Sequence, residues 1–428
     1  MTDAAVSGAR ELFEFDPERV ACPYPTFAAM RDRAPVAWYD ELEAFAVTRY
    51  DLIVEVLRHP EQFSSRSATG PAADRKLMTV MAELAAEDPE IAELAVKLMT
   101  EATAAVLLQA DPPEHPRQRA LVNRAFTPAA IHAIEPEIEA LAQGLIDGFI
   151  DKGEVELISE FAIPLPMAVI AKAVGVGADR VDDFMGWSNT LVAGVGVREL
   201  GKDEIASILR TRAVVADYLL GLVAERTDDP RDDLISKLAH AEIEGERLTP
   251  AEVVSMVIQF LLAGNHTTAM AISTCMLQLA GDPELADRLR AEPDLVAPFL
   301  EEVLRTEPPV NGTYRIADAE CELGGVHIPA GSALWLVYAS GNRDPDEFPD
   351  PDAFQCPQAS KSPHLTFGFG AHYCLGSSLA RAEAQIALRA LLDRCSDIRL
   401  GIDRADVAYD PSYMLHGLQS LPLTFAVG

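Results

Sequence analysis

The chain has 428 residues, of which 49% are hydrophobic and 24% are charged, a composition typical of a globular enzyme with a large core. Its 67 acidic and 35 basic residues give a net charge of −32, and so acidic a surface repels nucleic acids and anionic membranes. The six cysteines show no CxxC spacing, the N-terminus carries no apolar signal-peptide core, and no run of about 18 uninterrupted apolar residues occurs. We therefore expect a cytoplasmic protein with reduced thiols, no membrane span and no nucleic-acid partner.

The N-terminal half predicts helices and one early hairpin. Residues 35–50 alternate apolar and polar side chains as a β-hairpin does, and residues 51–60 predict a short helix that ends at Pro60. Residues from about 75 to 108 are rich in Ala, Leu, Met and Glu, and residues 128–227 predict amphipathic helices separated by Gly and Pro. Between them, DPPEHPRQR places His115 and Arg119 four residues apart on one helix face, by itself a weak signal for an anion site.

The best-defined element is a long helix that begins after Thr249 and ends at Gly281. Thr249 as N-cap, Pro250 at the first position and Glu252 at the third form a capping box, and Gly281 before Asp282-Pro283 supplies the stop. At 1.5 Å per residue this helix is about 45 Å long. It is apolar nearly all round, which predicts that it is buried through the middle of the molecule.

The centre of this helix reads Gly264-Asn265-His266-Thr267-Thr268. Glycine disfavours a helix interior by about 1 kcal/mol, and buried polar groups need partners. One interpretation is a kink solvated by one or two waters. The other is a groove in the helix wall where a small molecule and water meet.

The C-terminal third adds a helix, short strands and a long irregular segment. EEVLRTEPP places Glu302 and Arg305 three residues apart on one helix face, an arrangement that is by itself more often a surface ion pair. Arg315 stands just before a strand-like segment, and residues 321–336 predict a short hairpin. Residues 342–363 are rich in Pro and Asp and predict a long loop that covers a functional part. The chain is thus expected to be mainly helical, with small β-sheets at the edges.

A single cysteine lies in a glycine-rich loop, FGFGAHYCLG, from Phe367 to Gly376. Glycine permits left-handed backbone and close approach to another body. The residues that follow have helical spacing, so Cys374 should lie where the loop enters a helix, and the positive end of that helix would favour a thiolate. The cysteine is then a metal ligand or a nucleophile, and the alternative is a buried structural thiol.

Taken together and in this order, these segments resemble the cytochrome P450 family of haem-thiolate monooxygenases. The loop matches the family's haem-binding pattern F-G-x-G-x-[HR]-x-C-x-G at every fixed position, AGNHTT resembles its oxygen-binding groove, and Glu302 to Arg305 match its E-x-x-R motif. The resemblance runs from about residue 15 to the end. It implies the cytochrome P450 fold in one haem domain, residues 1–428, with the long buried helix over the haem and residues 1 to about 15 disordered.

The resemblance also implies the cofactor and the roles of the site residues. The cofactor is haem b, with Cys374 as the thiolate ligand of the iron, and a thiolate ligand favours O–O cleavage. Glu302 and Arg305 are expected to be structural. The residues expected to bind the haem, with Phe367 in the loop and the others at the propionates, are His115, Arg119, Arg315, His372 and Phe367, and those expected in catalysis are Gly264, His266 and Thr267.

The implied activity is insertion of one oxygen atom from O2 into an apolar or aromatic small molecule. Electrons come from a separate ferredoxin and ferredoxin reductase, and the protein is expected to be a monomer. Arg117 and Arg124 would form a local basic patch that steers an acidic ferredoxin to the cysteine side of the haem. By analogy, the substrate pocket includes residues 65–109, Val257, Phe260, Leu261, Gly264, residues 310–313, Met414 and Leu415.

Two departures from the family pattern leave alternatives open. His266 stands where an acid usually precedes the groove threonine; it relays protons or merely packs, and a peroxygenase that uses hydrogen peroxide is the second candidate. A non-catalytic haem sensor is the third, although Thr267 argues against it. No arginine stands near Gln358 and Ala359, only Lys361, so the ion network around Glu302 should be reduced or rearranged.

Overall fold

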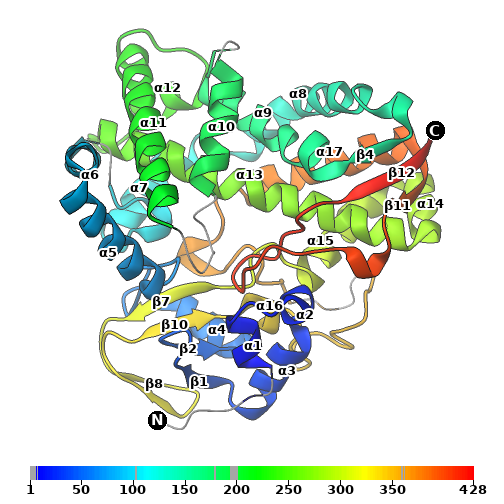
Figure 1. Ribbon diagram of the computed structural model, residues 1–428, viewed down its shortest axis with the longest axis horizontal. Coiled ribbons are helices and arrows are strands. Elements are labelled where there is room, and N and C mark those ends of the chain that lie inside the picture. The colour runs from blue at the N-terminus through cyan, green and yellow to red at the C-terminus, as the bar shows by residue number, and fades with distance from the viewer. Residues whose placement is uncertain are drawn as a thin grey trace.

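The computed structural model describes residue 6 and residues 8–101, 104–177, 180–192, 201–357, 360 and 362–428. It is built mainly of helices, with the long α13 running across the middle of the molecule (Figure 1). The helices are α1 (Ala9–Phe13), α2 (Pro17–Ala21), α3 (Tyr24–Arg33), α4 (Tyr50–Arg58), α5 (Pro71–Glu87), α6 (Pro89–Glu101), α7 (Glu114–Asn123), α8 (Pro128–Asp147), α9 (Pro164–Val174), α10 (Val181–Val192), α11 (Lys202–Asp228), α12 (Leu234–Ala239), α13 (Pro250–Gly281), α14 (Pro283–Ala291), α15 (Val296–Thr306), α16 (Tyr338–Gly341) and α17 (Ser377–Arg394).

The strands form two small sheets and two hairpins. A five-stranded sheet has the order β1-β2-β10-β7-β3, in which only β2 and β10 pair in parallel, and a three-stranded antiparallel sheet has the order β11-β12-β4. The strands are β1 (Val36–Tyr39), β2 (Ala44–Val47), β3 (Phe63–Ser64), β4 (Glu154–Glu156), β5 (Glu242–Ile243), β6 (Glu246–Arg247), β7 (Thr313–Ala317), β8 (Cys321–Leu323), β9 (Val326–Ile328), β10 (Ala333–Leu336), β11 (Cys395–Leu400) and β12 (Pro422–Val427).

Helix α13 is the predicted long helix, with the predicted ends. The side chain of Thr249 accepts a hydrogen bond from the N–H of Glu252, and the Glu252 carboxylate accepts one from the N–H of Thr249 at 2.8 Å. Among the described residues α13 alone is long and apolar enough to cross a membrane, and 61% of its most apolar window is buried inside the molecule. A buried core helix passes the same test, and α13 packs against α9, α11 and α17.

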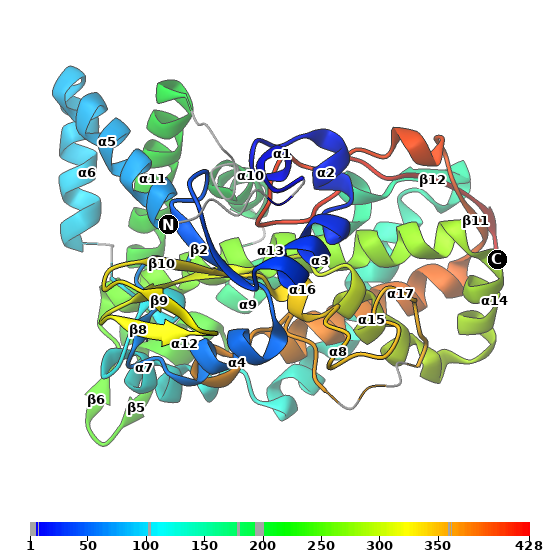
Figure 2. The ribbon, with the colours of Figure 1, turned by 90° about the horizontal axis from the view of Figure 1, so that it is seen from below.

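The core divides along α13. The C-terminal half of α13 packs with α8, α15 and α17, and the N-terminal half packs with α5, α6, α9 and α11 in a second apolar cluster. Further apolar clusters join the five-stranded sheet to α1, α3 and α4, which lie with that sheet in the lower part of Figure 1 and on the viewer's side in Figure 2, where the molecule is seen from below. This arrangement leaves α13 as the common wall of the helical part.

Three details differ from the expectations. Residues 8–15 are not disordered, because α1 buries Leu12 and Phe13 against the sheet; residues 1–5 and 7 lie outside the described residues. The segment 321–336 is not one hairpin: β8 and β9 form it, whereas β10 joins the five-stranded sheet. The helical stretch 128–227 also contains β4, whose short EVE sequence pairs with β12 from the far end of the chain.

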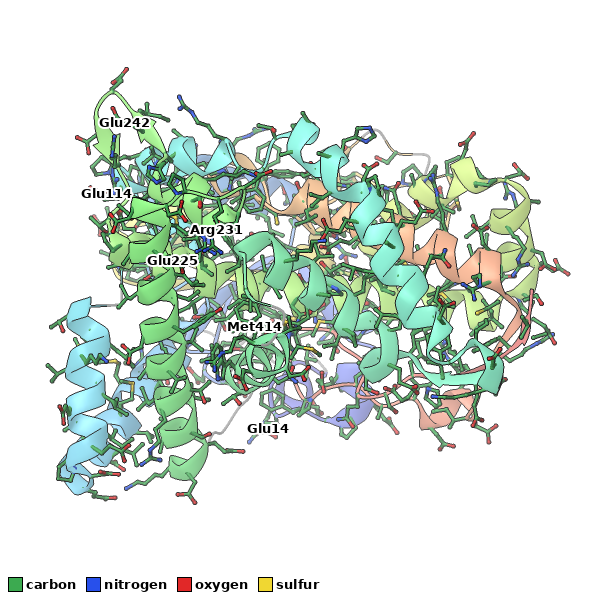
Figure 3. The ribbon with its side chains drawn as sticks, turned by 90° about the horizontal axis from the view of Figure 1, so that it is seen from above. Glu14, Glu114, Glu225, Arg231, Glu242 and Met414 are labelled. Atoms are coloured by element: carbon green, nitrogen blue, oxygen red, sulfur yellow. The ribbon has the colours of Figure 1, made fainter. Side chains whose placement is uncertain are left out.

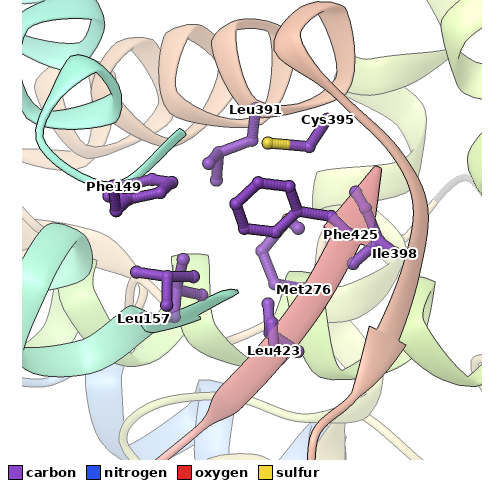
Figure 4. Close-up of a pocket in the computed structure, with 9 residues that line it drawn as sticks. Phe149, Leu157, Met276, Leu391, Cys395, Ile398, Leu423 and Phe425 are labelled. Carbon is purple, nitrogen blue, oxygen red and sulfur yellow. The ribbon is translucent and has the colours of Figure 1, made fainter. Parts of the chain in front are cut away.

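A small apolar hollow lies between α17, β11 and β12. Apolar side chains line it, among them Phe149, Met276, Leu391 and Phe425, which surround it in Figure 4. Cys395 closes it at the C-terminal end of α17, whereas Cys374 precedes the N-terminal end of the same helix. Because 18 helical residues span about 27 Å, this hollow is separate from the cysteine loop.

Candidate active site

Cys374 lies at the entry of α17, as its sequence context predicts. It stands two residues before the N-cap, Gly376, and its N–H donates to the carbonyl of Phe367 at 2.8 Å, which closes the loop. Gly368 and Gly370 have φ values of 72° and 70°, which disfavour any other residue. A Cβ on Gly370 would also lie 2.7 Å from the carbonyl oxygen of Leu57. The loop therefore requires these two glycines.

The helix end does not by itself keep this thiol deprotonated. Burial is the largest influence and raises the pKa of Cys374, while the N–H groups of Gly376 and Ser377 and the charges of Arg119 and Arg381 oppose it. The N–H groups at the helix N-terminus lower the pKa of Cys374, as predicted, but burial raises it by more. A metal ion bound to the sulfur would supply the missing stabilisation of the thiolate, because coordination deprotonates a thiol.

Arg381 on α17 holds the cysteine loop from outside. Its guanidinium lies 4.2 Å from the centroid of the Phe367 ring, and it donates two hydrogen bonds to Glu301 on α15, at 2.6 and 2.9 Å. His364 bonds the same carboxylate at 3.0 Å. Burial raises the pKa of Glu301, but these partners outweigh it and hold the pKa at about 2. This contact was missed in the sequence, because only the fold brings α15 and α17 together.

The four residues expected at the haem propionates gather in one place. The rings of His115 and His372 stack with centroids 3.9 Å apart; burial above all, and then the charges of Arg119 and Arg315, lower the pKa values of both rings. Ser65, which was not singled out individually, adds its hydroxyl 3.1 Å from His372 Nε2. These side chains come from α7, β7, the cysteine loop and the segment after β3.

This cluster has more positive charge than its protein neighbours neutralise. Burial is the main cause that lowers the pKa values of Arg119 and Arg315, and it lowers that of His372 to about 3. Arg315 donates only to the carbonyl of Tyr314 among the described residues, and the one nearby carboxylate, Asp111, already accepts from Ser64 and Ser65. The buried guanidinium of Arg315 and the partly buried one of Arg119, beside two imidazoles, fit a ligand with two carboxylates, as haem has.

The polar centre of α13 opens into space, which favours the groove over the kink. Ala263 and Gly264 are exposed in an otherwise buried helix, and apart from the surrounding helix backbone no described heavy atom lies within 4 Å of the place where a Cβ of Gly264 would stand. Thr267 Oγ1 donates to the carbonyl of Ala263 at 2.6 Å and lies beside this opening. Next to it, His266 Nδ1 is sealed from solvent and has no partner in the described part of the chain, and burial lowers the pKa of this imidazole.

Two residues expected in the substrate pocket lie in the packed core instead. Val257 and Leu261 are fully buried in the apolar cluster, and Phe260 packs edge-on against Phe126. The residue of this stretch that reaches the segment 104–109 is Gln259, whose amide bonds the backbone of Val106 and Leu108. Gln259 and His266 are seven residues apart and so share a helix face. Because this helix is apolar nearly all round, its residues do not indicate which face borders a pocket.

Glu302 and Arg305 form a buried pair, not a surface pair. Two hydrogen bonds of 2.8 Å join them, and Glu302 also accepts from the N–H of Gln355 at 2.7 Å. Arg305 donates in addition to the carbonyls of Asn342, Pro351 and Ala353, which fixes the irregular segment. The N–H of Gln355 thus binds Glu302, for which no further arginine was found in the sequence. Gln358, Ala359 and Lys361 lie outside the described residues.

The expected basic patch on α7 is largely compensated. Arg117 pairs with Glu114 at 2.8 Å and with the nearly buried Glu252, and Arg124 donates to the carbonyl of Glu242 at 3.1 Å. Glu114 and Glu242 lie at the same corner of the molecule (Figure 3). Arg124 is therefore the better candidate for an interaction with an acidic partner.

Comparison with known proteins identifies the family. The family model "Cytochrome P450" matches residues 204–398. Cytochrome P450 107B1 of Saccharopolyspora erythraea is 33% identical over 416 residues, which cover 96% of this chain and 97% of that protein. The chain belongs to the cytochrome P450 family.

Solved structures agree with this assignment. The structure of cytochrome P450 CYP109Q5 from Chondromyces apiculatus has a TM-score of 0.82 and 34% identity, covering 97% of this chain and 98% of that one. CYP109E1 from Bacillus megaterium in complex with testosterone has a TM-score of 0.80 and 30% identity, covering 94% and 99%. The predicted fold is confirmed, and so are the enzyme class, a haem-dependent monooxygenase, and the cofactor, haem b with a cysteine thiolate ligand.

Proposed function

We propose that this P450 inserts one oxygen atom of O2 into an apolar small molecule at the opening beside Ala263 and Gly264, with electrons from a separate ferredoxin and its reductase. One observation carries the proposal. Cys374, on a loop with the complete haem-binding pattern, and the open stretch of α13 share an apolar cluster through Leu375 and Leu262. The two faces of a haem site are thus supplied by α17 and α13.

The chain's residues divide into those that hold the cofactor and those that handle protons. Cys374 would bind the iron, and His115, Arg119, Arg315 and His372 would bind the two propionates. When bound, haem with a thiolate ligand would supply O2 activation and O–O bond cleavage. The cationic cluster described above supports this division, because its four positively charged or imidazole groups lie together on the side of α7 and β7.

Thr267 and His266 supply protons at the opening. The hydroxyl of Thr267 donates to the Ala263 carbonyl, so its lone pairs are free to accept from a water in the opening. Because burial lowers the pKa of His266, its imidazole is neutral at pH 7 and can accept a proton on one nitrogen while it donates from the other.

The substrate is an apolar molecule of up to steroid size. The cluster that surrounds the opening is formed by aliphatic and aromatic side chains such as Leu107, Leu262 and Phe260. The related CYP109E1 was solved with testosterone bound. We propose further that the chain is a single haem domain, and a cytoplasmic monomer without a nucleic-acid partner, in line with its net charge of −32.

The test is product formation from a library of steroids, terpenoids and aromatic compounds. The holoenzyme is supplied with a ferredoxin, its reductase, NAD(P)H and isotopically labelled O2, and the products are analysed by mass spectrometry. We expect products that gain one labelled oxygen atom. Products that form only with added hydrogen peroxide would identify a peroxygenase instead, and haem reduction without any product across the library would favour a sensor.

A further inference from the structure

Arg212 on α11 is a cation on the inner side of the helix that no group among the described residues neutralises. It shares a helix face with Leu209, Ala216 and Leu219, of which each is at most 5% exposed, while Val214 on the opposite face is 49% exposed. Its Nε is sealed from solvent and has no hydrogen-bond partner. Arg212 therefore points inward from the middle of α11.

Two other arginines of the same helix, unlike Arg212, are paired with carboxylates. Arg210 pairs with Asp88 and Glu90, and Arg226 pairs with Asp233 at 2.6 Å. Within the part of the chain that the structure describes, no carboxylate or carbonyl bonds Arg212, and burial lowers its pKa with no acid opposing the shift. In a protein with 67 acidic and 35 basic residues, partners for a merely structural arginine are abundant.

The face that carries Arg212 belongs to the apolar cluster that also reaches the opening of α13. Leu209, Ala216 and Leu219 belong to the apolar cluster that also contains Ile258 and Leu261 of α13. Leu262 and Leu375 pack against the same cluster. Leu262 precedes the exposed Ala263, and Leu375 follows Cys374. A ligand that fills the space from the opening toward α11 would bring its far end to the guanidinium.

We propose that Arg212 binds a carboxylate on the substrate, so that the enzyme takes amphiphilic acids whose apolar part extends to the opening beside Ala263. The inference rests on the proposed function and names the substrate class of the same site. A buried cation is unfavourable unless an anion pairs with it, and a planar guanidinium matches a carboxylate with two parallel hydrogen bonds. The apolar surroundings strengthen that pair because they exclude water.

The experiment uses ligands that bind haem iron whatever the natural substrate is. A homologous series of ω-(imidazol-1-yl)alkanoic acids is compared with the matching ω-(imidazol-1-yl)alkanols, and binding to the holoenzyme is followed by the Soret shift. At one chain length we expect the acid to bind at least about tenfold more tightly than the alcohol, a ratio that corresponds to about 1.4 kcal/mol. In Arg212→Gln this preference should fall to about one while the affinity for the alcohol stays the same.

Two further variants serve as controls. Arg210→Gln removes an exposed, paired arginine from the other face of α11 and should keep the preference, and Arg212→Lys should keep part of it. Equal binding of acid and alcohol at every chain length, or a preference that survives in Arg212→Gln, would overturn the inference alone. Absence of a Soret shift with every alcohol would overturn the proposed haem site and this inference with it.

Discussion

The imidazole of His115 on α7 stacks on the imidazole of His372 in the cysteine loop, with ring centroids 3.9 Å apart and planes inclined by 29°. This contact joins two segments more than 250 residues apart, and Arg119 and Arg315 influence both rings. The cysteine loop is thus held next to the groups proposed to bind the propionates, before any cofactor is considered.

Arg315→Gln should weaken haem binding. The variant removes a buried guanidinium from the proposed propionate site, and a hydrogen bond to a charged group contributes about 1.5–3 kcal/mol, or about tenfold to hundredfold in affinity. The rate of haem transfer to apomyoglobin measures the effect. Arg66→Gln, which changes an exposed arginine paired with Asp318, should transfer haem at the wild-type rate. Equal rates for both variants would place the propionates elsewhere.

Glu383 on α17 should make stability fall with rising pH. It is buried without a partner among the described residues, and burial raises its pKa to about 8, whereas an unfolded glutamate has a pKa of about 4.3. Between these values the folded state binds more protons, so the free energy of unfolding decreases as the pH rises toward 8. Relative to Glu383→Gln, wild type should lose about 2–3 kcal/mol from pH 6 to pH 8. Parallel pH profiles of the two holoproteins in urea unfolding would refute this.

Arg117 and Arg124 should separate stability from partner binding. Arg117→Gln leaves the carboxylate of Glu252, which is 9% exposed, without its cation and should lower the free energy of unfolding by about 1–3 kcal/mol. It should leave reduction by ferredoxin nearly unchanged. Arg124→Glu should slow that reduction at low salt and flatten its dependence on ionic strength, since exposed charges are screened over about 8 Å at 0.15 M. The measurement is the rate of reduction by ferredoxin in stopped-flow experiments across a salt series. If only Arg117→Gln slowed this reduction, Arg117 and not Arg124 would bind the ferredoxin.

Thr267→Ala should keep ligand binding but divert most electrons into hydrogen peroxide. Without the hydroxyl, no side chain beside Ala263 orders the water that delivers protons. The measurement is product and peroxide formed per NAD(P)H consumed, and Thr267→Ser, which retains a hydroxyl, should stay largely coupled. Full coupling in Thr267→Ala would mean that the opening is not the oxygen site.

His266→Ala should slow turnover and weaken its pH dependence below about pH 6.5, where this imidazole titrates because burial lowers its pKa, since a proton acceptor is lost from the opening. His266→Glu should retain much of the rate, since a carboxylate can carry the same proton. If both variants turn over at the wild-type rate at every pH, His266 only packs against its neighbours and protons enter by another path.

Local patterns predicted much of this fold. The capping box at Thr249, the stop at Gly281 and the glycines around Cys374 are rules that act within a few residues, and the structure has them as expected. The hairpin of β1 and β2 and the helix α4 follow from alternation and apolar spacing in the same way.

Relationships between distant segments could not be predicted. Packing of the whole chain brings together Ser65 and His372, Arg381 and Phe367, and Arg117 and Glu252. The same limit explains the errors: a helix as apolar as α13 gives no sign of which face borders the opening, so Leu261 was expected there and Gln259 was not. Burial likewise decides the pKa of Cys374, and burial is not a local property.

The most direct test of the central claim is the absorption spectrum of the reduced, CO-bound protein. A thiolate donates more electron density to haem iron than an imidazole does, and the Soret band of the CO complex then lies at the long wavelength for which the family is named. Freshly prepared wild type should show this band, and Cys374→His should show only the shorter-wavelength band of histidine-ligated haem. If wild type gives the histidine-type band, or if Cys374→His keeps the long-wavelength band, Cys374 is not the ligand and the account fails.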